Sequence, residues 1–380
     1  MRTMIEGISP PSLDEREHLP WIALTRVHGL GCTGFKRVAD HLSDPRQVFW
    51  LSEKELGQVP GLDRQAIEGI LSFSNWNEVR EEMGRIFEAG VRIVPFSDAN
   101  YPPRLRMIPD PPPFLYVKGE IRGGDENAVA VVGSRSASEY GLRITRDLCR
   151  GLASLGFTVV SGMALGIDGE AHQEAIGVGG RTVAVLGSGV DVAYPGEHKA
   201  LYQTICQHGA VLSELPMGTP PFSYNFPTRN RIISGLSLGV VVVEATERSG
   251  SLITARLAGE QGREVFAVPG QAGASRSRGT HRLIRQGAKL VDGIGDIIEE
   301  IAPQFLSQAG RLKEVPSPTL PPDTSPEVRK VFELVLRGPI QIDEVIQASG
   351  LSPAKVSGIL LDMEIKGYLR QLPGKRFRIN

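Results

Sequence analysis

Cysteine is scarce in this sequence of 380 residues, which contains only Cys32, Cys149 and Cys206. An odd number of widely spaced cysteines supports neither a disulfide framework nor a cysteine-based metal site. Long apolar runs are missing too, because no stretch reaches the roughly 18 apolar residues of a membrane-spanning helix. The first 20 residues contain four acidic side chains and lack the apolar run of a secretory signal. We therefore expect a reduced, cytoplasmic protein.

The sequence also lacks an excess of either charge, since 42 Lys and Arg residues balance 43 Asp and Glu residues. Binding to nucleic acid would therefore depend on a local cluster of basic side chains. With 41% hydrophobic residues, 44 glycines and 27 prolines, the composition is that of a globular protein with many tight turns. The length indicates two or three domains.

Residues 1–75 predict a small helical domain. The turns Val27–Gly31 and Val59–Leu62 are each followed by an amphipathic helix, a repeat that resembles helix-hairpin-helix or sterile-alpha-motif bundles. A glycine turn that opens a helix can present backbone N–H groups to a phosphate, but short glycine turns also join helices that bind nothing. Nucleic-acid contact and simple packing both remain open for this domain.

Residues 76–305 predict an α/β domain with a doubly wound parallel sheet of the Rossmann-like type. Short β-branched runs alternate there with glycine-rich turns and helical periodicity. Expected strands are Ala128–Val132, Phe157–Val160, Arg181–Leu186, Ala210–Ser213, Val240–Glu244 and Glu264–Val268. Continuous apolar strands indicate burial on both faces of the sheet, and such sheets bind ligands at the carboxyl ends of their strands.

A proline-rich segment precedes these strands. We expect a helix near Glu78–Ala89 and a strand at Val91–Pro95, followed by a proline-rich run over residues 101–113. Because proline fixes φ and lacks a donor, this run should lie extended over a surface. It is either a linker or an extra layer on the next domain. The apolar strand Phe114–Val117 favours the second interpretation because it needs burial.

The C-terminal part of the chain predicts a linker and a winged helix. Residues 306–325 are proline-rich and suited to an exposed linker. Residues 326–380 predict three helices, Glu327–Arg337, Ile342–Ser349 and Pro353–Lys366, and then the strands Tyr368–Leu372 and Arg376–Ile379. The segment Lys375–Arg378 of the wing is basic, so the domain is expected either to touch duplex DNA or to dock a protein.

Small residues follow the first three predicted strands of the sheet. Glycine and serine allow main-chain amides to converge on an oxyanion, and the next helix adds its dipole. Candidate binding residues in these turns are Gly133, Ser134, Ser161, Gly162, Gly166, Gly187 and Gly189. Rossmann-like folds also use such turns purely for packing.

Arginine and aromatic residues accompany the turns. Arg135 lies in the first turn, and Phe226–Arg231 opens the helix after the fourth strand. Guanidinium groups hold phosphates, and rings such as Phe222, Tyr224 or Phe226 can stack on a base for about 1–3 kcal/mol. The competing interpretation pairs Arg229 and Arg231 with structural acids such as Glu214 or Glu244 and places Phe226 in the core.

Signatures of catalysis are missing from the turns. The first turn reads Gly133-Ser134-Arg135-Ser136 instead of the glycine fingerprint of a dinucleotide site, and no phosphate-binding G-x-x-x-x-G-K-[ST] motif occurs. Asp168 and His172 lie one helical turn apart, but N-capping explains the aspartate, and no histidine is placed to activate Ser161 or Ser249. We expect no catalytic residue, no cofactor and no metal.

Six ordered motifs resemble the DNA-processing protein A (DprA/Smf) family. They are Gly133-Ser134-Arg135; Ser161-Gly162 with Gly166-Ile167-Asp168 and Ala171-His172; Gly187-x-Gly189-x-Asp191 with Tyr194-Pro195; Phe226-Pro227-x-Arg229-Asn230-Arg231; Glu244-Ala245 with Ser249-Gly250-Ser251; and Val268-Pro269-Gly270. The resemblance implies an extended Rossmann fold that binds single-stranded DNA, forms a homodimer and loads the RecA recombinase during natural transformation.

The resemblance also implies which residues bind DNA and which surface forms the dimer. Besides the small residues of the turns, the implied DNA site contains Arg135, Lys199, Phe226, Arg229, Asn230, Arg231, Ser249 and Gly250. The apolar segment Leu283–Val291 is the expected dimer interface. The alternative is a Rossmann-like nucleotide phosphoribohydrolase of the lysine-decarboxylase-like group. Its P-G-G-x-G-T-x-x-E motif is missing, and Glu247–Thr254 is the nearest segment.

Overall fold

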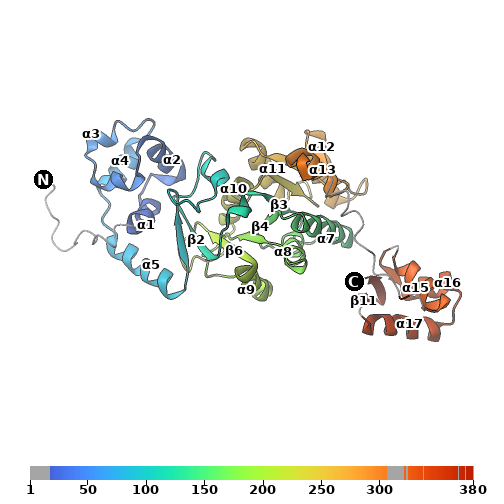
Figure 1. Cartoon of the computed structure of the whole chain (residues 1–380). Coiled ribbons are helices and arrows are strands. Elements are labelled where there is room, and N and C mark those ends of the chain that lie inside the picture. The colour runs from blue at the N-terminus through green and yellow to red at the C-terminus, as the bar shows by residue number, and fades with distance from the viewer. Residues whose placement is uncertain are drawn as a thin grey trace. The chain divides into compact units, whose positions relative to one another are not determined.

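The computed structural model describes residues 18–305, 321, 324–336, 338–366, 368–372 and 374–379 (Figure 1). The chain divides into two compact units, Met1–Gly310 and Arg311–Asn380. Most of the predicted linker, residues 306–325, lies outside the described residues. Within the described part of the chain, every helix is too short or too polar to cross a membrane.

The first unit is built on a nine-stranded sheet in the order β1-β2-β6-β5-β4-β3-β7-β8-β9. The strands are β1 (Arg92–Pro95), β2 (Phe114–Gly119), β3 (Ala128–Val132), β4 (Thr158–Ser161), β5 (Thr182–Val185), β6 (Gly209–Ser213), β7 (Gly239–Val242), β8 (Glu264–Ala267) and β9 (Lys289–Leu290). Across the sheet, each neighbouring pair in the series β6-β5-β4-β3-β7-β8-β9 is parallel. At the edge, β1 pairs antiparallel with β2, and β2 pairs antiparallel with β6. This sheet confirms the predicted Rossmann-like class.

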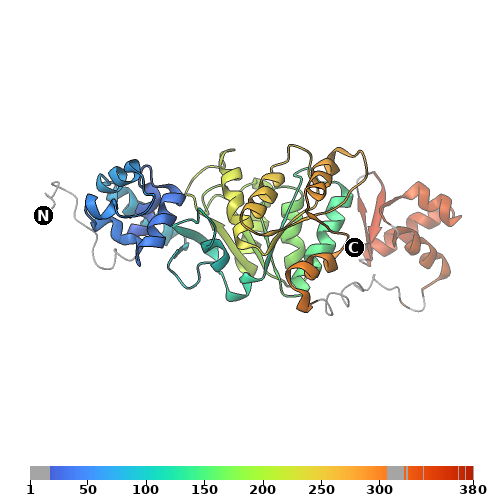
Figure 2. The same ribbon diagram turned by 90° about the horizontal axis from the view of Figure 1, so that it is seen from above.

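Helices cover both faces of the sheet (Figures 1 and 2). Those of the first unit are α1 (Leu19–Arg26), α2 (Gly31–His41), α3 (Glu53–Leu56), α4 (Arg64–Leu71), α5 (Trp76–Glu88), α6 (Pro103–Arg106), α7 (Glu139–Ser154), α8 (Ile167–Gly177), α9 (Lys199–His208), α10 (Asn225–Leu236), α11 (Ser251–Glu260), α12 (Arg278–Arg285) and α13 (Ile294–Ile301). Along β3, Val129 and Val131 face α7, α8 and α13, while Ala130 and Val132 face α10 and α11. Every residue of β3 is buried, as the apolar pattern predicts.

The strand at Phe114–Val117 extends the sheet instead of forming a separate layer. β2 pairs with β6, and Tyr116 lies opposite Ser213. The proline-rich run also differs from the prediction. It contains the short helix α6, and residues 111–113 are buried while the Tyr101 hydroxyl donates to the Pro112 carbonyl (2.9 Å). Since proline has no N–H to leave unpaired, this segment can enter the core without a sheet partner.

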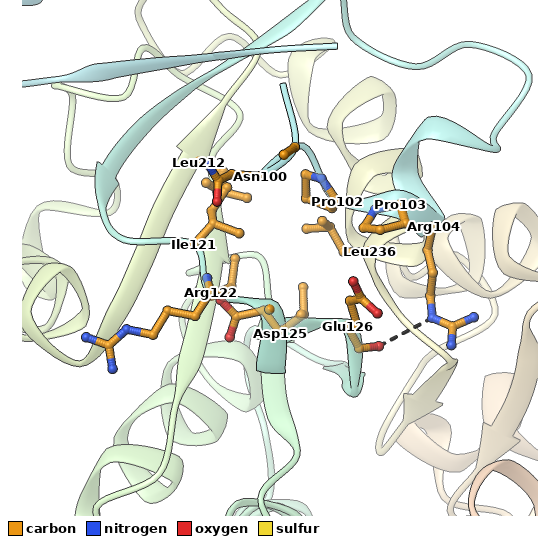
Figure 3. A pocket seen from close by; sticks show the side chains of 14 residues that line it. Asn100, Pro102, Pro103, Arg104, Ile121, Arg122, Asp125, Glu126, Leu212 and Leu236 are labelled. Atoms are coloured by element: carbon orange, nitrogen blue, oxygen red, sulfur yellow. Dashed lines mark hydrogen bonds between the residues drawn. The ribbon is translucent and has the colours of Figure 1, made fainter. Parts of the chain in front are cut away.

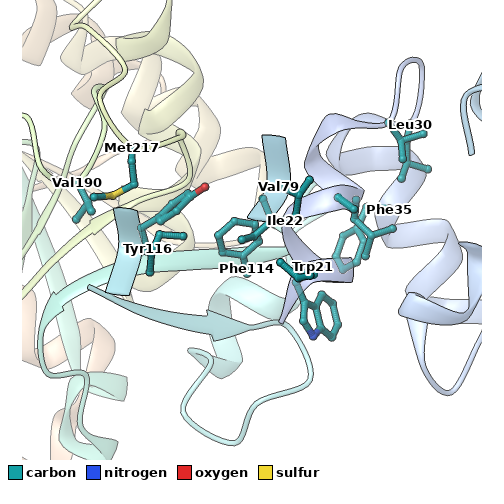
Figure 4. Packing of buried hydrophobic residues seen from close by; sticks show 14 of the residues in the cluster. Trp21, Ile22, Leu30, Phe35, Val79, Phe114, Tyr116, Val190 and Met217 are labelled. Atoms are coloured by element: carbon teal, nitrogen blue, oxygen red, sulfur yellow. The ribbon is translucent and has the colours of Figure 1, made fainter. Parts of the chain in front are cut away.

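The N-terminal helices share a continuous core with the sheet. Trp21 of α1, Phe35 of α2 and Val79 of α5 belong to the same buried cluster as Phe114 and Tyr116 of β2 (Figure 4). The turn before α2 needs Gly29, whose φ of +81° is costly for any side chain. The helices expected for residues 1–75 are therefore present from residue 19 onward and pack on the antiparallel edge.

The second unit has the element order of a winged helix. Its elements are α15 (Pro326–Leu336), β10 (Ile340–Gln341), α16 (Ile342–Ser349), α17 (Pro353–Ile365), β11 (Leu369–Leu372) and β12 (Arg376–Ile379). The three strands form a sheet in the order β10-β12-β11. Val331, Val345, Leu360 and Phe377 belong to a separate buried core, so this unit has its own hydrophobic centre.

Glu82 is a fully buried carboxylate between the helices and the sheet. It accepts hydrogen bonds from the Tyr116 hydroxyl of β2 and from the Met217 main-chain N–H (3.1 Å), and it pairs with Arg26 of α1. A buried charge is tolerated only when its partners satisfy it. Glu82 therefore fixes α1 and α5 against the sheet.

We predict that Glu82→Ala lowers the free energy of unfolding by about 3–5 kcal/mol, because it leaves Arg26 and the Tyr116 hydroxyl without their buried acceptor. Denaturant unfolding monitored by circular dichroism measures this change. The exposed neighbour Glu81 provides the control, and Glu81→Ala should stay within about 0.5 kcal/mol of the wild type. Equal stabilities of the two variants would contradict the role assigned to Glu82.

Candidate nucleic-acid interface

A cleft of about 490 Å³ lies at the carboxyl ends of the parallel strands, where the strand order reverses between β3 and β7. Residues after β3 and β7 line it together with the starts of α10 and α11. The lining includes Gly133, Ser134, Arg135, Tyr194, Phe226, Arg229, Asn230, Thr246, Ser249, Gly250, Ser251 and Thr254. This is the position at which doubly wound sheets bind ligands.

Arg135 presents an exposed guanidinium group to the cleft. Its Cζ lies 5.4 Å from the centroid of the Phe226 ring. Among the described residues, no carboxylate forms an ion pair with it. A cation held over an aromatic face keeps its charge and its donors available to an anion.

Hydrogen bonds from two other segments of the chain hold the loop that carries Arg135 in place. Glu244, just after β7, accepts hydrogen bonds from the Ser138 N–H (2.9 Å) and from the Ser138 hydroxyl. Arg276 Nε donates to the Ser136 carbonyl (2.9 Å). Glu244 therefore acts on the loop and the start of α7. Among the described residues it forms no ion pair with Arg229 or Arg231.

Arg229 is buried and supports the floor of the cleft. It donates from Nη1 to the Gly162 carbonyl (2.9 Å) and to the Val185 carbonyl, so it links the ends of β4 and β5. Burial lowers its pKa to about 10, although the charge of Asp168 acts in the opposite direction. Asp168 accepts from the Gly162 N–H (3.1 Å), and burial raises the pKa of this carboxyl despite the nearby arginine.

The other predicted turn residues serve packing. A Cβ on Gly162 would lie 2.7 Å from both terminal nitrogens of Arg229, and one on Gly187 would lie 2.7 Å from the Phe226 ring. Gly166 has a φ of +75°. Ser161 donates to the Val131 carbonyl (2.6 Å). These four residues and Gly189 are absent from the lining of the cleft, so their small size allows close contacts within the domain.

Arg231 lies away from the cleft in a buried ion-pair cluster. It pairs with Glu214 (2.5 Å) and Asp110 (3.0 Å), and its Nη2 is 3.3 Å from the Cys32 sulfur of α2. Residues that are two positions apart on an α-helix are separated by about 200° around its axis. Arg229 and Arg231 therefore point in opposite directions. The structure agrees here with the ion-pair interpretation. Lys199 is exposed at the start of α9 and also does not line the cleft.

Eight of the predicted residues do meet at the cleft: Gly133, Ser134, Arg135, Phe226, Arg229, Asn230, Ser249 and Gly250. Sequence reasoning missed Tyr194 and the hydroxyls of Thr246, Ser251 and Thr254, although Ser251 stands in the same Ser-Gly-Ser motif. Neither α10 nor α11 has a side-chain cap at its start. Both helices therefore direct the positive ends of their dipoles at the cleft, although the Leu252 and Ile253 N–H groups already donate to the Ser249 and Gly250 carbonyls.

A second, smaller cavity is a poor candidate. Its volume is about 70 Å³, and Pro102, Leu212 and Leu236 contribute to an apolar lining (Figure 3). At its rim, Arg104 Nε donates to the Glu126 carbonyl (3.3 Å), and Asp125 is paired with Arg181. The polar groups at this rim are thus partly occupied by internal contacts, and none of the predicted binding residues lines the cavity.

His172 has a structural environment. It is fully buried on α8, and its Nδ1 lies 2.6 Å from the Thr182 hydroxyl, which itself donates to the Val159 carbonyl (2.7 Å). Burial lowers the pKa of His172 to about 3. In the described part of the chain, no group of three His, Cys, Asp or Glu side chains is arranged to hold a metal ion.

Comparison with known proteins places this arrangement in a family. Residues 92–302 match the family described as DNA recombination-mediator protein A, and residues 315–375 match the DprA winged helix domain. Protein Smf from Synechocystis is 34% identical over 95% of this chain and 98% of its own length. The chain belongs to the DprA/Smf family. Protein Smf from Escherichia coli is 37% identical over 94% of this chain and 95% of its own.

A solved structure of a DprA/Smf protein shares the fold. The X-ray structure of DprA from Streptococcus pneumoniae superposes with a TM-score of 0.65 at 36% identity and covers 74% of this chain and 98% of that chain. The family match at residues 92–302 spans β1 to α13 and includes every residue that lines the cleft. The cleft therefore lies inside the part of the chain that defines the DprA/Smf family.

Because His172 is neutral when folded, acid should destabilise the protein. Its pKa falls from 6.5 to about 3 on burial, so below pH 6.5 the unfolded chain binds a proton that the folded chain does not. We predict that lowering the pH from 7 to 5.5 removes about 1 kcal/mol of stability through this group.

Denaturant unfolding of wild type and His172→Asn as a function of pH isolates that contribution. The difference in the free energy of unfolding between wild type and His172→Asn should become smaller as the pH falls. For His208→Asn, at an exposed site on α9, the free energy of unfolding should change with pH as it does for the wild type. Parallel curves for His172→Asn and wild type would show that His172 is not the responsible group.

Proposed function

We propose that this chain binds single-stranded DNA in the cleft, protects incoming DNA and delivers it to the RecA recombinase during natural transformation. The observation that carries the proposal is the exposed guanidinium of Arg135, stacked on Phe226 at a cleft where two uncapped helices begin. Membership of a family described as DNA recombination mediators supports it. Binding without hydrolysis needs only these donors and rings.

Phosphate and base contacts have separate sources in this proposal. Arg135 would hold phosphate oxygens, and the positive dipole ends of α10 and α11 would favour them. Every DNA sequence has the same phosphates. The hydroxyls of Ser249, Ser251 and Thr254 add adaptable donors beside them. Since such contacts are mainly electrostatic, affinity should fall with salt and depend little on sequence.

An aromatic pair beside the cleft supplies a surface for bases. The Phe222 and Tyr224 rings stack with centroids 5.4 Å apart and an interplanar angle of 11°. They are 45% and 68% exposed, and the loop that carries them leads directly into α10. Every base has a flat π-face, so parallel exposed rings can hold an unpaired base whatever its identity.

We also propose a homodimer through α12 and β9. A groove of about 730 Å³ between α11 and α12 contains Leu252, Val265 and Leu283 in its lining. Leu290 of β9 is an exposed large apolar residue in the segment that the sequence analysis singled out. An apolar groove with arginines such as Arg248 and Arg282 at its sides has the composition of a protein interface.

Replacement of Arg135 tests the DNA site directly. We predict that Arg135→Ala weakens binding of a fluorescent single-stranded oligonucleotide severalfold and reduces the salt slope by about 0.7, the value for one phosphate contact. Arg143→Ala is a matched control, since Arg143 on α7 also lies over an aromatic ring, Tyr140 (5.7 Å), but does not line the cleft. Identical isotherms for both variants at low salt would remove the assignment.

Deletion of the aromatic pair tests base stacking separately. We predict that Phe222→Ala with Tyr224→Ala weakens binding of a normal oligonucleotide about tenfold, which corresponds to roughly 1.4 kcal/mol. An abasic oligonucleotide should bind this variant and the wild type equally, because it has phosphates but no rings to stack. Phe87→Ala, at an exposed aromatic on α5, serves as the control. An equal loss with abasic DNA would contradict stacking.

A further inference from the structure

The exposed face of α17 in the winged helix is apolar. Leu361 and Ile365 are 57% and 77% exposed. Together with Ala354 and Gly358 they follow a spacing of four, three and four residues, which places all four on one stripe of the helix. The opposite face fills the core of the unit with Val356, Leu360 and Met363.

This stripe is poorly suited to DNA, although α17 occupies the position of a recognition helix. The helix contains no arginine. Lys355 pairs with Glu327 (2.5 Å), and Lys366 at its end pairs with Asp362 (2.7 Å). A helix that reads a groove needs free donors, whereas this face offers two aliphatic side chains beside small residues.

We propose that α17 packs antiparallel against the α17 of a second copy of the chain. The stripe has small residues in its first half and large ones in its second half. Reversal of one helix therefore sets Leu361 of one copy against Gly358 of the other, and Ile365 against Ala354. The same surface serves both copies, as a twofold contact requires.

The glycine in the stripe supports this occupant. A Cβ on Gly358 would meet no atom within 4 Å in its own chain. Packing inside the unit therefore does not require glycine, even though glycine weakens a helix by about 1 kcal/mol relative to alanine. In the antiparallel pair, the space that a side chain would fill is occupied by Leu361 of the other copy.

Charges beside the stripe are compatible with the pairing. In an antiparallel pair related by a twofold axis, each flank of the helix meets the same flank of the other copy. Lys355 of one copy then lies near Asp362 of the other, so each adds a second opposite charge beside its exposed partner within the chain, Glu327 or Lys366. On the other flank, the Ser357 hydroxyl can donate to the Glu364 carboxylate of the second copy. Opposite charges face each other along one flank.

The C-terminal unit has its own core, so the experiment uses it both alone and within the full chain. Sedimentation equilibrium of residues 311–380 from about 10 µM to about 1 mM should show a reversible dimer, since a single helix seam is smaller than a stable interface of about 1,200 Å². Leu361→Glu should raise the dimer dissociation constant at least about tenfold. Leu336→Glu, at an exposed leucine on α15, is the matched control.

Gly358→Lys distinguishes a contact from a folding defect. Lysine favours a helix over glycine, so this variant should raise the thermal midpoint of the unit while it weakens dimerisation. In the full chain, both α17 variants should bind an oligonucleotide with room for only one chain through Arg135 as the wild type does.

Two results would overturn the proposal. One is a unit that stays monomeric at the highest concentration, which would mean that something other than a second copy covers α17. The other is unchanged sedimentation of Leu361→Glu together with weaker binding to duplex DNA, which would assign the helix to DNA. Neither result bears on the cleft, whose test depends on Arg135.

Discussion

The Phe226 ring is the contact on which the cleft is assembled. Arg135 lies over it at 5.4 Å, Arg229 at 6.0 Å, and Tyr194 packs beside it with ring centroids 5.7 Å apart. Gly187 allows the ring to approach the end of β5, because a Cβ there would overlap it. One aromatic side chain therefore connects three strand ends and positions the exposed guanidinium.

Two arginines of the cleft have opposite roles because their environments differ. Arg229 is buried, and two main-chain carbonyls accept hydrogen bonds from it, so its charge is used to hold β4 and β5 together. Arg135 remains exposed, and its loop is held in place by Glu244 through Ser138. A ligand anion can bind Arg135 without breaking an internal ion pair. Removal of Arg229, in contrast, would leave buried main-chain carbonyls without their donor.

Sequence patterns predicted most of the sheet, and eight of the fifteen candidate binding residues line the cleft. β-branched runs predict β3 to β8 within a few residues, because parallel strands buried on both faces have few other compositions. The sequence did not predict β9, because a strand of two residues is too short to show a hydrophobic pattern. The pairing of β2 with β6 depends on contacts far apart in the chain, which local periodicity does not contain.

The candidate residues that lie away from the cleft have a common geometric explanation. A motif gives the order of residues but not the direction of their side chains, so Arg229 and Arg231 appear equivalent in sequence although they occupy opposite sides of α10. The same applies to glycine, which permits close approach whether the neighbour is a phosphate or a side chain. Gly162 and Gly187 meet side chains of their own domain. Only the partner across the contact distinguishes the two uses.

The proposed surfaces differ in the affinity that each needs. A seam of four residues on α17 buries too little area to hold two free chains together at low concentration. Chains bound side by side on one DNA strand, however, raise each other's effective concentration, so a contact that free chains make only at high concentration becomes populated on DNA as well. The same weakness that makes the α17 contact hard to detect in a free chain would therefore make it respond to DNA.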